Sequence, residues 1–334
     1  MMKQLKLLGL AFGLFLVTPT LFAQEVLNIS SWAPPTHHIN NVVWPTWGKW
    51  VEEATEGRVT TKIEYNLASP LKQFELVRDG VADAAWIFHG YNTRYVATQA
   101  VEMPNLGTSA EAASVAYWRV HQKHLAKADE HRGVTLIGLT SHGPAVIQTK
   151  APLNSLDDLS GQKIRVPGGV GSLVGKALGV TAVKLPAPKV YEALSSGVAD
   201  GIFMPIETQK SFRLKEVVPH VTIMPGGLYY GSFAFIMNSD FLAGLSETDR
   251  NAVMSVSGEK LAKLAGQQWD AADVAGLAAA KKAGTTITTA SAEMHKKYLA
   301  IMAPIEAQWI ERANNLGIDG KAALEELRAI ARGY

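Results

Sequence analysis

The chain has 334 residues, of which 47% are hydrophobic and 19% charged, and its formal net charge is +2. This composition is that of a globular protein long enough for one large domain or two lobes. Scattered lysines and arginines exclude a nucleic-acid-binding surface, and the absence of cysteine excludes disulfides, thiolate nucleophiles and thiolate metal sites.

The first 23 residues have the pattern of a secretory signal peptide. Lys3 and Lys6 form a positively charged start, residues 7–17 form an apolar segment, and Leu21-Phe22-Ala23 is a suitable cleavage site. The alternative is a membrane anchor, but such an anchor needs about 20 apolar residues and this run is shorter. We therefore expect an exported protein that is cleaved near Ala23 and is not embedded in the membrane.

Two distant stretches of the chain share one pattern. Residues 72–83 are KQFELVRDGVAD and residues 189–200 are KVYEALSSGVAD. Each copy predicts a short amphipathic helix, then a glycine, Gly80 or Gly197, that ends the helix in a left-handed conformation, and then a buried strand. Chance similarity of two helix-to-strand turns does not account for so many matching positions at fixed spacing.

The sequences that precede the two copies also correspond. Residues 27–32 and 58–66 predict two strands before the first copy, and residues 162–167 and 180–186 predict two strands before the second. A strand, helix, strand, helix, strand series implies parallel pairing with right-handed crossovers. We expect an α/β fold with two hinged lobes of similar topology.

The character of the chain changes to helical from about residue 246. A long alanine-rich tract ends at Gly284, a short β-rich segment follows, and a second tract extends from Ser291 to Gly317 before a last helix over 320–332. Helices of this length can brace two lobes. The predicted division is a signal peptide at 1–23, lobe I at 24–142 plus 231–270, and lobe II at 143–230 plus 271–334, with the long bracing helix near 291–316.

The sequence contains no recognisable catalytic or cofactor motif. The glycines of GGVGSLVGK at 168–176 have neither the spacing of a phosphate-binding loop nor that of a dinucleotide fingerprint. His121 and His124 are three residues apart among lysines, which is typical of a solvated surface, and no Gly-x-Ser-x-Gly is present. We expect no metal site, no cofactor and no enzymatic activity.

One cationic residue has the position of a ligand-binding group. Arg165 lies in the strand KIRV, which ends at Pro167-Gly168-Gly169, and the carboxyl ends of such strands are where α/β sheets bind ligands. A guanidinium can hold a carboxylate through two parallel hydrogen bonds. The alternative is an arginine on an edge strand that faces solvent.

Several motifs, in this order along the chain, resemble those of one transport family: SSWAPPTHHINN, DGVADAAW, LDDLSGQKIRVPGG, YEALSSGVADG and GSFAFIMNSDFLAGLSETDR. The family is the substrate-binding proteins of tripartite ATP-independent periplasmic (TRAP) transporters, dicarboxylate-binding (DctP) type. The resemblance covers the mature chain. It implies a two-lobed periplasmic binding-protein fold of type II, a long helix behind both lobes, a membrane permease as partner, and pairing of Arg165 with a substrate carboxylate.

The chain departs from the family pattern at two places. Met204, with Phe203 beside it, occupies a position where the family often has an asparagine that contacts the carboxylate, and residues 141–152 lack a second arginine. Both departures weaken a dicarboxylate or sialic-acid interpretation.

Aromatic residues dominate the loops that we expect at the cleft. A pocket with one arginine and apolar or aromatic walls favours a monocarboxylate with an apolar or aromatic body, such as a benzoate or a 2-oxo acid. The alternative is that several of these residues form core. The predicted ligand-binding residues are Arg165, Trp32, His37, Phe88, Tyr91, His142, Phe203, Met204, Glu207, Tyr229 and Tyr230.

Other functions and ligands remain open at this point. An exported enzyme that acts on an organic acid would need an acid/base pair in the cleft, and Glu207 with His142 is the pair that the sequence offers. A structural or interaction protein is the weakest alternative, because the chain has no low-complexity segment and no solenoid repeat. A dicarboxylate or a sugar acid remains an alternative ligand.

Overall fold

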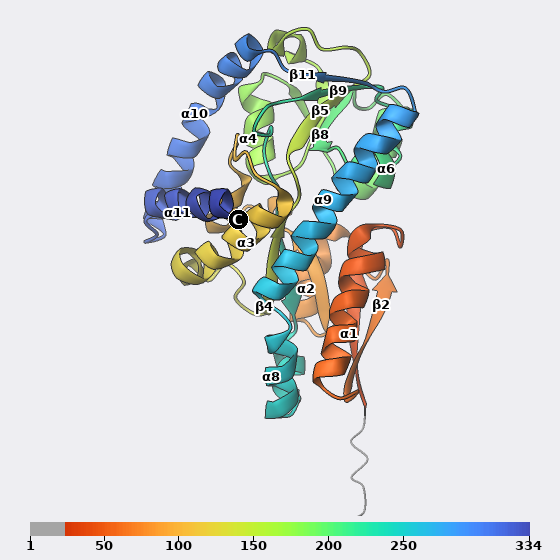
Figure 1. The fold of residues 1–334 in the computed structure, drawn as a ribbon, viewed down its shortest axis with the longest axis vertical. Helices are drawn as coiled ribbons and strands as arrows, with labels where there is room; N and C mark the ends of the chain where they lie inside the picture. The colour runs from red at the N-terminus through yellow and green to blue at the C-terminus, as the bar shows by residue number, and fades with distance from the viewer. Residues whose placement is uncertain (1–23) are drawn as a thin grey trace, which may run out of the picture.

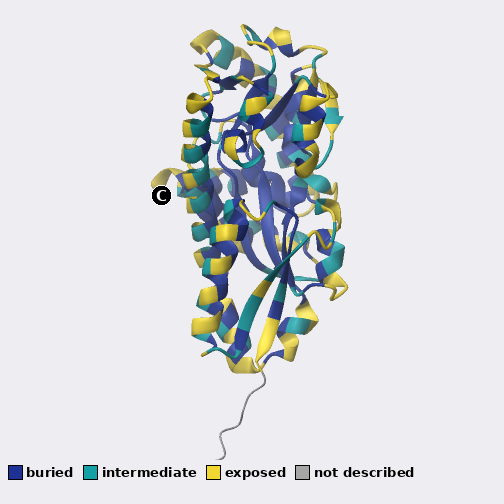
Figure 2. Cartoon of the chain, turned by 90° about the vertical axis from the view of Figure 1, so that its right-hand side faces the viewer, coloured by how far each residue is buried: buried dark blue, intermediate teal, exposed yellow. Residues whose placement is uncertain are grey.

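The computed structural model describes residues 24–334, which form two β-sheets with helices packed around them (Figure 1). The predicted signal peptide and the cleavage site near Ala23 lie outside the described residues. Figure 2 shows buried residues concentrated along the centre of the molecule and exposed residues on the outer faces of the helices. None of the helices within 24–334 is long and apolar enough to cross a membrane.

Lobe I is the part of the chain around the first sheet, whose strand order is β2-β1-β3-β10-β4. The three strands β2, β1 and β3 are parallel, and β10 is antiparallel to its neighbours β3 and β4. The strands of this sheet are β1 (Glu25–Ser31), β2 (Val59–Tyr65), β3 (Ala84–Phe88), β4 (Thr135–Ser141) and β10 (Ser232–Met237).

Lobe II is the part of the chain around the second sheet, whose strand order is β11-β9-β5-β8-β6-β7. Here β7, β6 and β8 are parallel, β5 is antiparallel to both β8 and β9, and β11 is parallel to β9. The strands of this sheet are β5 (Ala145–Thr149), β6 (Lys163–Val166), β7 (Thr181–Lys184), β8 (Gly201–Pro205), β9 (His220–Ile223) and β11 (Thr286–Thr289).

The two copies of the repeated sequence have the same structure in the two lobes. The first copy forms α2 (Gln73–Arg78) and leads into β3, and the second forms α5 (Val190–Ser195) and leads into β8. Gly80 and Gly197 follow these helices with φ of +72° and +79°, a conformation that glycine adopts without strain. The trio β2-β1-β3 therefore corresponds to β7-β6-β8, which confirms the predicted α/β fold with two similar lobes.

Two connections between the lobes lie side by side. Residues 142–144 join β4 to β5, and residues 224–231 join β9 to β10. Backbone hydrogen bonds link these connections, because Ala145 N donates to Tyr229 O at 2.9 Å and Leu228 N donates to Ala145 O at 3.0 Å. The hinge region is thus a pair of hydrogen-bonded segments.

A long helix, α9 (Glu259–Lys282), extends along both lobes (Figure 1). In lobe I it packs against α3 (Ala110–Val120) and β4, and in lobe II it packs against α6 (Thr208–Ser211). Because α9 contacts both lobes beside the hinge connections, it braces them.

We expected the bracing helix near 291–316, and α10 (Ala292–Asn315) lies there. It packs against α4 (Gly169–Ala177) and α11 (Gly320–Gly333). It also contacts both lobes, since Trp309 Nε1 donates to Val96 O of lobe I at 2.8 Å and Lys297 forms an ion pair with Asp157 of lobe II at 2.6 Å. The predicted long C-terminal helix is therefore present, in addition to α9.

The remaining α-helices, which lie in lobe I, are α1 (Trp44–Ala54), α7 (Ser239–Gly244) and α8 (Glu247–Ser255). Side chains cap the N-terminal ends of several helices of the protein. A side-chain oxygen accepts a hydrogen bond from the first turn of α3, α7, α8, α10 and α11, and the capping residues are Ser109, Asn238, Ser246, Ser291 and Asp319.

Candidate ligand-binding site

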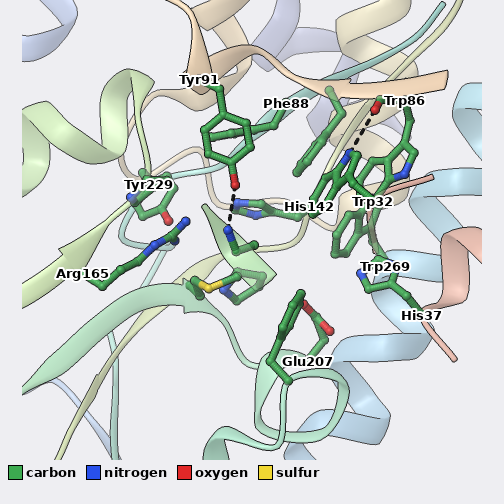
Figure 3. A pocket seen from close by; sticks show the side chains of 16 residues that line it. Trp32, His37, Trp86, Phe88, Tyr91, His142, Arg165, Glu207, Tyr229 and Trp269 are labelled. Atoms are coloured by element: carbon green, nitrogen blue, oxygen red, sulfur yellow. Dashed lines mark hydrogen bonds between the residues drawn. The ribbon is translucent and has the colours of Figure 1, made fainter. Parts of the chain in front are cut away.

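A cavity lies between the two lobes, where the carboxyl ends of their parallel strands meet (Figure 3). This is the place where open α/β sheets bind ligands. It is lined by Trp32, His37, Trp86, Phe88, Tyr91, His142, Arg165, Pro167, Ala187, Met204, Pro205, Glu207, Phe212, Tyr229, Phe233 and Trp269.

Arg165 supplies the positive charge of the cavity. Among the lining side chains in the described range it is the only lysine or arginine, and its exposed fraction is 2%. Its Nε and Nη2 donate to the carbonyl oxygen of Leu185 at 3.1 and 3.0 Å, which fixes the guanidinium in the cavity wall. None of the ion pairs within residues 24–334 involves Arg165.

This arrangement leaves a buried cation without a protein counter-charge. An unpaired buried charge is costly, and a charge-assisted bond to an anion offsets that cost. The site is therefore suited to an anionic group that enters from outside.

An aromatic wall from lobe I faces the cavity. Trp32 and Trp86 stack with ring centroids 4.2 Å apart and planes 16° apart, and Phe233 lies 5.3 Å from Trp86 and 5.1 Å from Phe88. Trp269 on α9 stacks on Phe233 at 5.5 Å. Flat aromatic faces at these spacings suit a planar apolar ligand body.

Hydrogen bonds hold the two stacked indoles in place. Trp32 Nε1 donates to the backbone oxygen of Trp86 at 3.1 Å, and Trp86 Nε1 donates to Ser31 Oγ at 3.1 Å. Ser31 Oγ in turn donates to Asn40 Oδ1 at 2.6 Å. Because both indole N–H groups have partners in lobe I, this wall is formed before any ligand enters.

The two lobes contact each other at the rim of the cavity. Tyr91 of lobe I accepts a hydrogen bond at its hydroxyl oxygen from the Ala187 N–H of lobe II, 2.9 Å away. Gly90 and Gly168 meet backbone to backbone, so that a Cβ on Gly168 would lie 1.4 Å from Gly90 O. The structure therefore has the lobes closed over the cavity.

A buried carboxyl group makes a further contact between the lobes. Glu102, in a 3₁₀ helix of lobe I, accepts a hydrogen bond from the Val170 N–H in the first turn of α4 at 2.7 Å, and Ser232 Oγ also donates to it. Burial raises the pKa of Glu102 to about 7. This contact lies behind the Pro167-Gly168-Gly169 turn and supports it.

Two histidines of the cavity are neutral and have opposite tautomers. Burial lowers the pKa of His142 to about 4 and that of His37 to about 3. His142 Nδ1 lies 2.6 Å from Gly143 O, so it donates and leaves Nε2 as an acceptor. Ile39 N donates to His37 Nδ1 at 3.3 Å, which leaves the proton on Nε2 as a donor.

Glu207 follows β8 and lines the cavity from lobe II. Its exposed fraction is 2%, and burial raises its pKa to about 8, so its carboxyl group is protonated at neutral pH. Ser211 Oγ donates to it, and its backbone N–H donates to Asp273 Oδ1 at 3.0 Å. In this state Glu207 does not supply a counter-charge for Arg165.

The structure also brings together three groups that are typical metal ligands. One ligand atom each of His37, His38 and Glu207 lie within 4.8 Å of one another. We expected no metal site, because the histidines of the sequence lack the spacing of a metal-binding motif. Two histidines and a carboxylate can hold zinc, but the hydrogen bond from Ile39 to His37 opposes coordination through Nε2 of His37.

The structure places nine of the predicted ligand-binding residues in the cavity wall and two elsewhere. The nine are Arg165, Trp32, His37, Phe88, Tyr91, His142, Met204, Glu207 and Tyr229. Phe203 and Tyr230 are buried in the core instead. Side chains alternate along an extended chain, so Met204 faces the cavity and Phe203 faces the core. The Tyr230 hydroxyl donates to the backbone oxygen of Thr108, a residue outside the cavity wall, at 2.8 Å.

Sequence reasoning missed seven lining residues, namely Trp86, Pro167, Ala187, Pro205, Phe212, Phe233 and Trp269. A signal existed for Trp86, because it lies two positions before Phe88 and therefore on the same face of β3. Phe233 lies opposite Phe88 in the antiparallel pair of β10 and β3, a pairing that no local pattern reveals. Trp269 comes from the middle of α9, far along the chain, and the sequence around it reads as an ordinary amphipathic helix.

Residues 29–312 match the family described as bacterial extracellular solute-binding protein, family 7 (DctP). The chain belongs to this family. Its members are the solute-binding receptors of TRAP transporters, so the resemblance and the prediction of a binding protein rather than an enzyme are confirmed.

One relative and one solved structure of this family resemble the chain over almost its whole length. The chain is 31% identical over 311 residues to the "Outer membrane transporter protein TsaT" of Comamonas testosteroni, with 92% of each chain covered. A solved structure of a TRAP periplasmic solute-binding protein from Bordetella bronchiseptica, with bound (R)- and (S)-mandelate, is 38% identical and has a TM-score of 0.90. The match covers 92% of this chain and 99% of that one.

A third family member is a TRAP solute-binding protein from Rhodoferax ferrireducens T118 in complex with copurified benzoate. Its structure matches with a TM-score of 0.87 and 27% identity, and the match covers 93% of this chain and 98% of that one. The two-lobed α/β fold predicted from the sequence is therefore the fold of this family.

Proposed function

We propose that this receptor captures an aromatic monocarboxylate in the periplasm and delivers it to a TRAP membrane permease. The observation that carries the proposal is Arg165, a buried cation without a protein counter-charge at the edge of an aromatic wall. The carboxylate of the ligand pairs with the guanidinium, and the ring lies between the aromatic side chains. The mandelate and benzoate of the two similar structures support this ligand class.

The same observations argue against a dicarboxylate. Within the described residues, no second lysine or arginine lines the cavity. A second carboxylate would be buried without a cation, which is unfavourable. Met204 and Tyr229 add apolar and neutral surface beside Arg165, and Tyr229 OH is already bonded to Phe203 O at 2.9 Å.

Delivery depends on closure of the lobes over the ligand. We take lobe I as 24–142 plus 231–270 and lobe II as 143–230 plus 271–334, moving about the connections at 142–144 and 224–231. Trp32 and Phe88 contact the ring from lobe I while Arg165 holds the carboxylate from lobe II, so a ligand that bridges them favours the closed state. The permease then recognises the closed receptor, which is exported by the signal peptide and cleaved near Ala23.

The test is ligand binding to residues 24–334 by calorimetry and thermal shift, with benzoate, mandelate, succinate and a sugar acid. We expect the aromatic acids to bind and to stabilise the protein by about 2.7 kcal/mol at 100 times Kd. Arg165→Ala should abolish binding, and Lys163→Ala, an exposed cation on the same strand, should not change it. Binding of succinate in place of the aromatic acids, or binding that survives Arg165→Ala, would contradict the proposal.

A further inference from the structure

A second polar group of side chains lies in the cavity, away from Arg165. Figure 3 shows Arg165 on one side of the cavity and His37 and Glu207 on the other. His38 does not line the cavity but lies next to them, since its ligand atom and those of His37 and Glu207 lie within 4.8 Å of one another. We call His37, His38 and Glu207 the polar cluster.

The polar cluster has hydrogen-bonding groups without protein partners. His38 Nε2 is buried, and so is Nε1 of Trp269, whose ring lies 4.2 Å from that of His38; neither atom has a partner within residues 24–334. Trp269 also lines the cavity. Buried polar atoms are rarely left unpaired in folded proteins, and since Trp269 belongs to the cavity wall, its N–H is available to a polar atom of the ligand.

The polar cluster offers both donors and acceptors to a ligand. His37 Nε2 carries a proton, because Nδ1 accepts from Ile39 N, and is therefore a donor. Glu207 receives the Ser211 hydroxyl on Oε2 and has Oε1 in addition. A hydroxyl group can accept from His37 and donate to a carboxyl oxygen at the same time, whereas a carbonyl or ether oxygen can only accept.

Two other occupants fit the polar cluster less well. A divalent cation would need a lone pair on His37 Nε2, and the hydrogen bond from Ile39 places the proton there. A second carboxylate would lie beside the carboxyl group of Glu207, and Arg165, the one cation of the cavity wall in the described residues, lies on the other side. A neutral hydroxyl requires neither a counter-charge nor a change of tautomer.

We propose that the polar cluster binds a hydroxyl group on the ring of the aromatic carboxylate that Arg165 holds. The preferred ligands are therefore hydroxyl-substituted aromatic monocarboxylates, with the hydroxyl remote from the carboxylate. This inference rests on the proposed function, because it takes the carboxylate at Arg165 as given. The stacked indoles of Trp32 and Trp86 form the wall along which the ring extends from one polar end to the other.

The experiment compares benzoate with 3-hydroxybenzoate and 4-hydroxybenzoate by isothermal titration calorimetry. The unchanged protein should bind at least one hydroxybenzoate about 10-fold more tightly than benzoate, the effect of roughly one good hydrogen bond. Glu207→Met and His37→Phe, which keep volume and remove the polar atoms, should each reduce this preference to about 3-fold or less. Glu192→Met, a change of an exposed glutamate outside the cavity, should leave the preference intact.

Benzoate serves as the internal control for folding and for the Arg165 end of the site. A variant that still binds benzoate within about 3-fold of the unchanged protein, but has lost the preference, supports the inference. The inference is overturned if benzoate and both hydroxybenzoates bind the unchanged protein equally, or if the preference survives both substitutions. Stoichiometric binding of Zn²⁺ that both substitutions abolish would overturn it in favour of a metal site.

Failure of the proposed function gives a different result. In that case neither benzoate nor a hydroxybenzoate binds the unchanged protein, or both ligands bind Arg165→Ala as tightly as they bind the unchanged protein. Both the proposed function and this inference then fall together. A loss of hydroxyl preference with intact binding through Arg165 concerns the polar cluster alone.

Discussion

Asp270 and Asp273 lie one turn apart on α9, and each accepts hydrogen bonds from the backbone of a different lobe. Asp270 accepts from Ala110 N and Glu111 N, at 2.7 and 3.0 Å, at the start of α3 in lobe I. Asp273 accepts from Glu207 N at 3.0 Å, immediately before α6 in lobe II. These bonds fix α9 to both lobes, and carboxylates suit the positive ends of helices.

Close backbone contacts reinforce both attachments of α9. A Cβ on Gly266 would lie 2.6 Å from Glu111 Cα, and a Cβ on Gly276 would lie 2.4 Å from Glu207 Cα and from Ile206 O. Such distances leave room for glycine alone, because the atoms in the way are backbone. One glycine and one aspartate of α9 thus make close backbone contacts with each lobe, in addition to the side-chain packing of the helix.

Gly276→Ala should destabilise the protein by about 1–3 kcal/mol, because the added methyl group forces the backbone of α9 away from that of lobe II. Urea unfolding measures the change. The matched control is Gly244→Ala at the end of α7, where a Cβ would meet nothing within 4 Å. Equal stability of the two variants would show that α9 does not pack against lobe II at this point.

Gly168→Ala should block closure of the lobes while leaving their folding intact. The added Cβ would lie 1.4 Å from Gly90 O, an atom of the opposite lobe, so the clash exists only when the lobes are closed. We expect the affinity for the aromatic acid to fall about 10-fold or more, because the binding-competent state becomes rare. Unfolding in urea should change little.

Small-angle scattering gives the second measurement on this variant. The unchanged protein should become more compact when the aromatic acid is added, and Gly168→Ala should not. Compaction of the variant to the same extent would mean that closure does not require the contact between Gly90 and Gly168.

The sequence predicts the fold of each lobe because the signals are local. A helix, a glycine with positive φ and an apolar strand lie within about a dozen residues of one another, so the two copies of the repeat specify the same units. Arg165 was predicted for the same reason, since it lies on a strand whose end is marked by the following Pro167-Gly168-Gly169. The place of such a residue in the fold can be predicted from the local sequence pattern and from its position within the repeated strand-helix unit.

The remainder of the site depends on packing between distant parts of the chain. Phe233 reaches the cavity because β10 pairs with β3, and Trp269 reaches it because α9 lies across both lobes. Neither the pairing nor the position of α9 is encoded in the residues beside Phe233 or Trp269. The same limit led us to place Phe203 and Tyr230 at the ligand, because which face of a strand is turned to the cavity depends on its neighbours.

The repeated aspartates, Asp83 and Asp200, should each stabilise their lobe by about 1–3 kcal/mol. Asp83 Oδ2 accepts from Asn28 N at 2.7 Å, and Asp200 Oδ2 accepts from Lys163 N at 3.1 Å. Each aspartate therefore ties the first strand of its unit to the residue that immediately precedes the third strand. Replacement by alanine leaves a strand N–H without its acceptor.

Urea unfolding of Asp83→Ala, Asp200→Ala and the double variant measures these contributions. The two losses should add, because the aspartates belong to different sheets and share no partner. Glu52→Ala, a change of an exposed residue on α1, should have little effect. A stability of Asp200→Ala equal to that of this control would contradict the structural equivalence of the two aspartates.

The stability of the protein without ligand should be highest near pH 6.5, because two sets of buried groups act in opposite directions. Burial lowers the pKa of six histidines below 6.5, with His37 and His131 at about 3 and His121 and His142 at about 4. The other two are His38 and His89. The unfolded chain binds protons at these sites that the folded chain does not, so stability rises with pH up to about 6.5.

Four carboxyl groups have the opposite effect, and one of them is Asp270, whose pKa is raised by burial. Burial raises the pKa of Glu102 and Asp273 to about 7 and that of Glu207 to about 8. The folded protein keeps protons that the unfolded chain has lost, so their contribution is present below pH 4 and is lost as the pH rises through 7 to 8. Between about pH 4.5 and 6.5 the histidines outnumber the carboxyl groups and stability rises, whereas above 6.5 the carboxyl groups act alone and stability falls.

Urea unfolding at pH 5.5, 6.5, 7.5 and 8.5 measures this profile. Glu207→Gln should make the fall above pH 6.5 shallower, because it removes one group that must lose a proton in the folded state. Glu192→Gln, which changes an exposed group, should leave the slope unaltered. A stability that still rises between pH 7.5 and 8.5 would mean that Glu102, Asp273 and Glu207 ionise without cost in the folded protein, and Glu207 would then carry a negative charge into the cavity that holds Arg165.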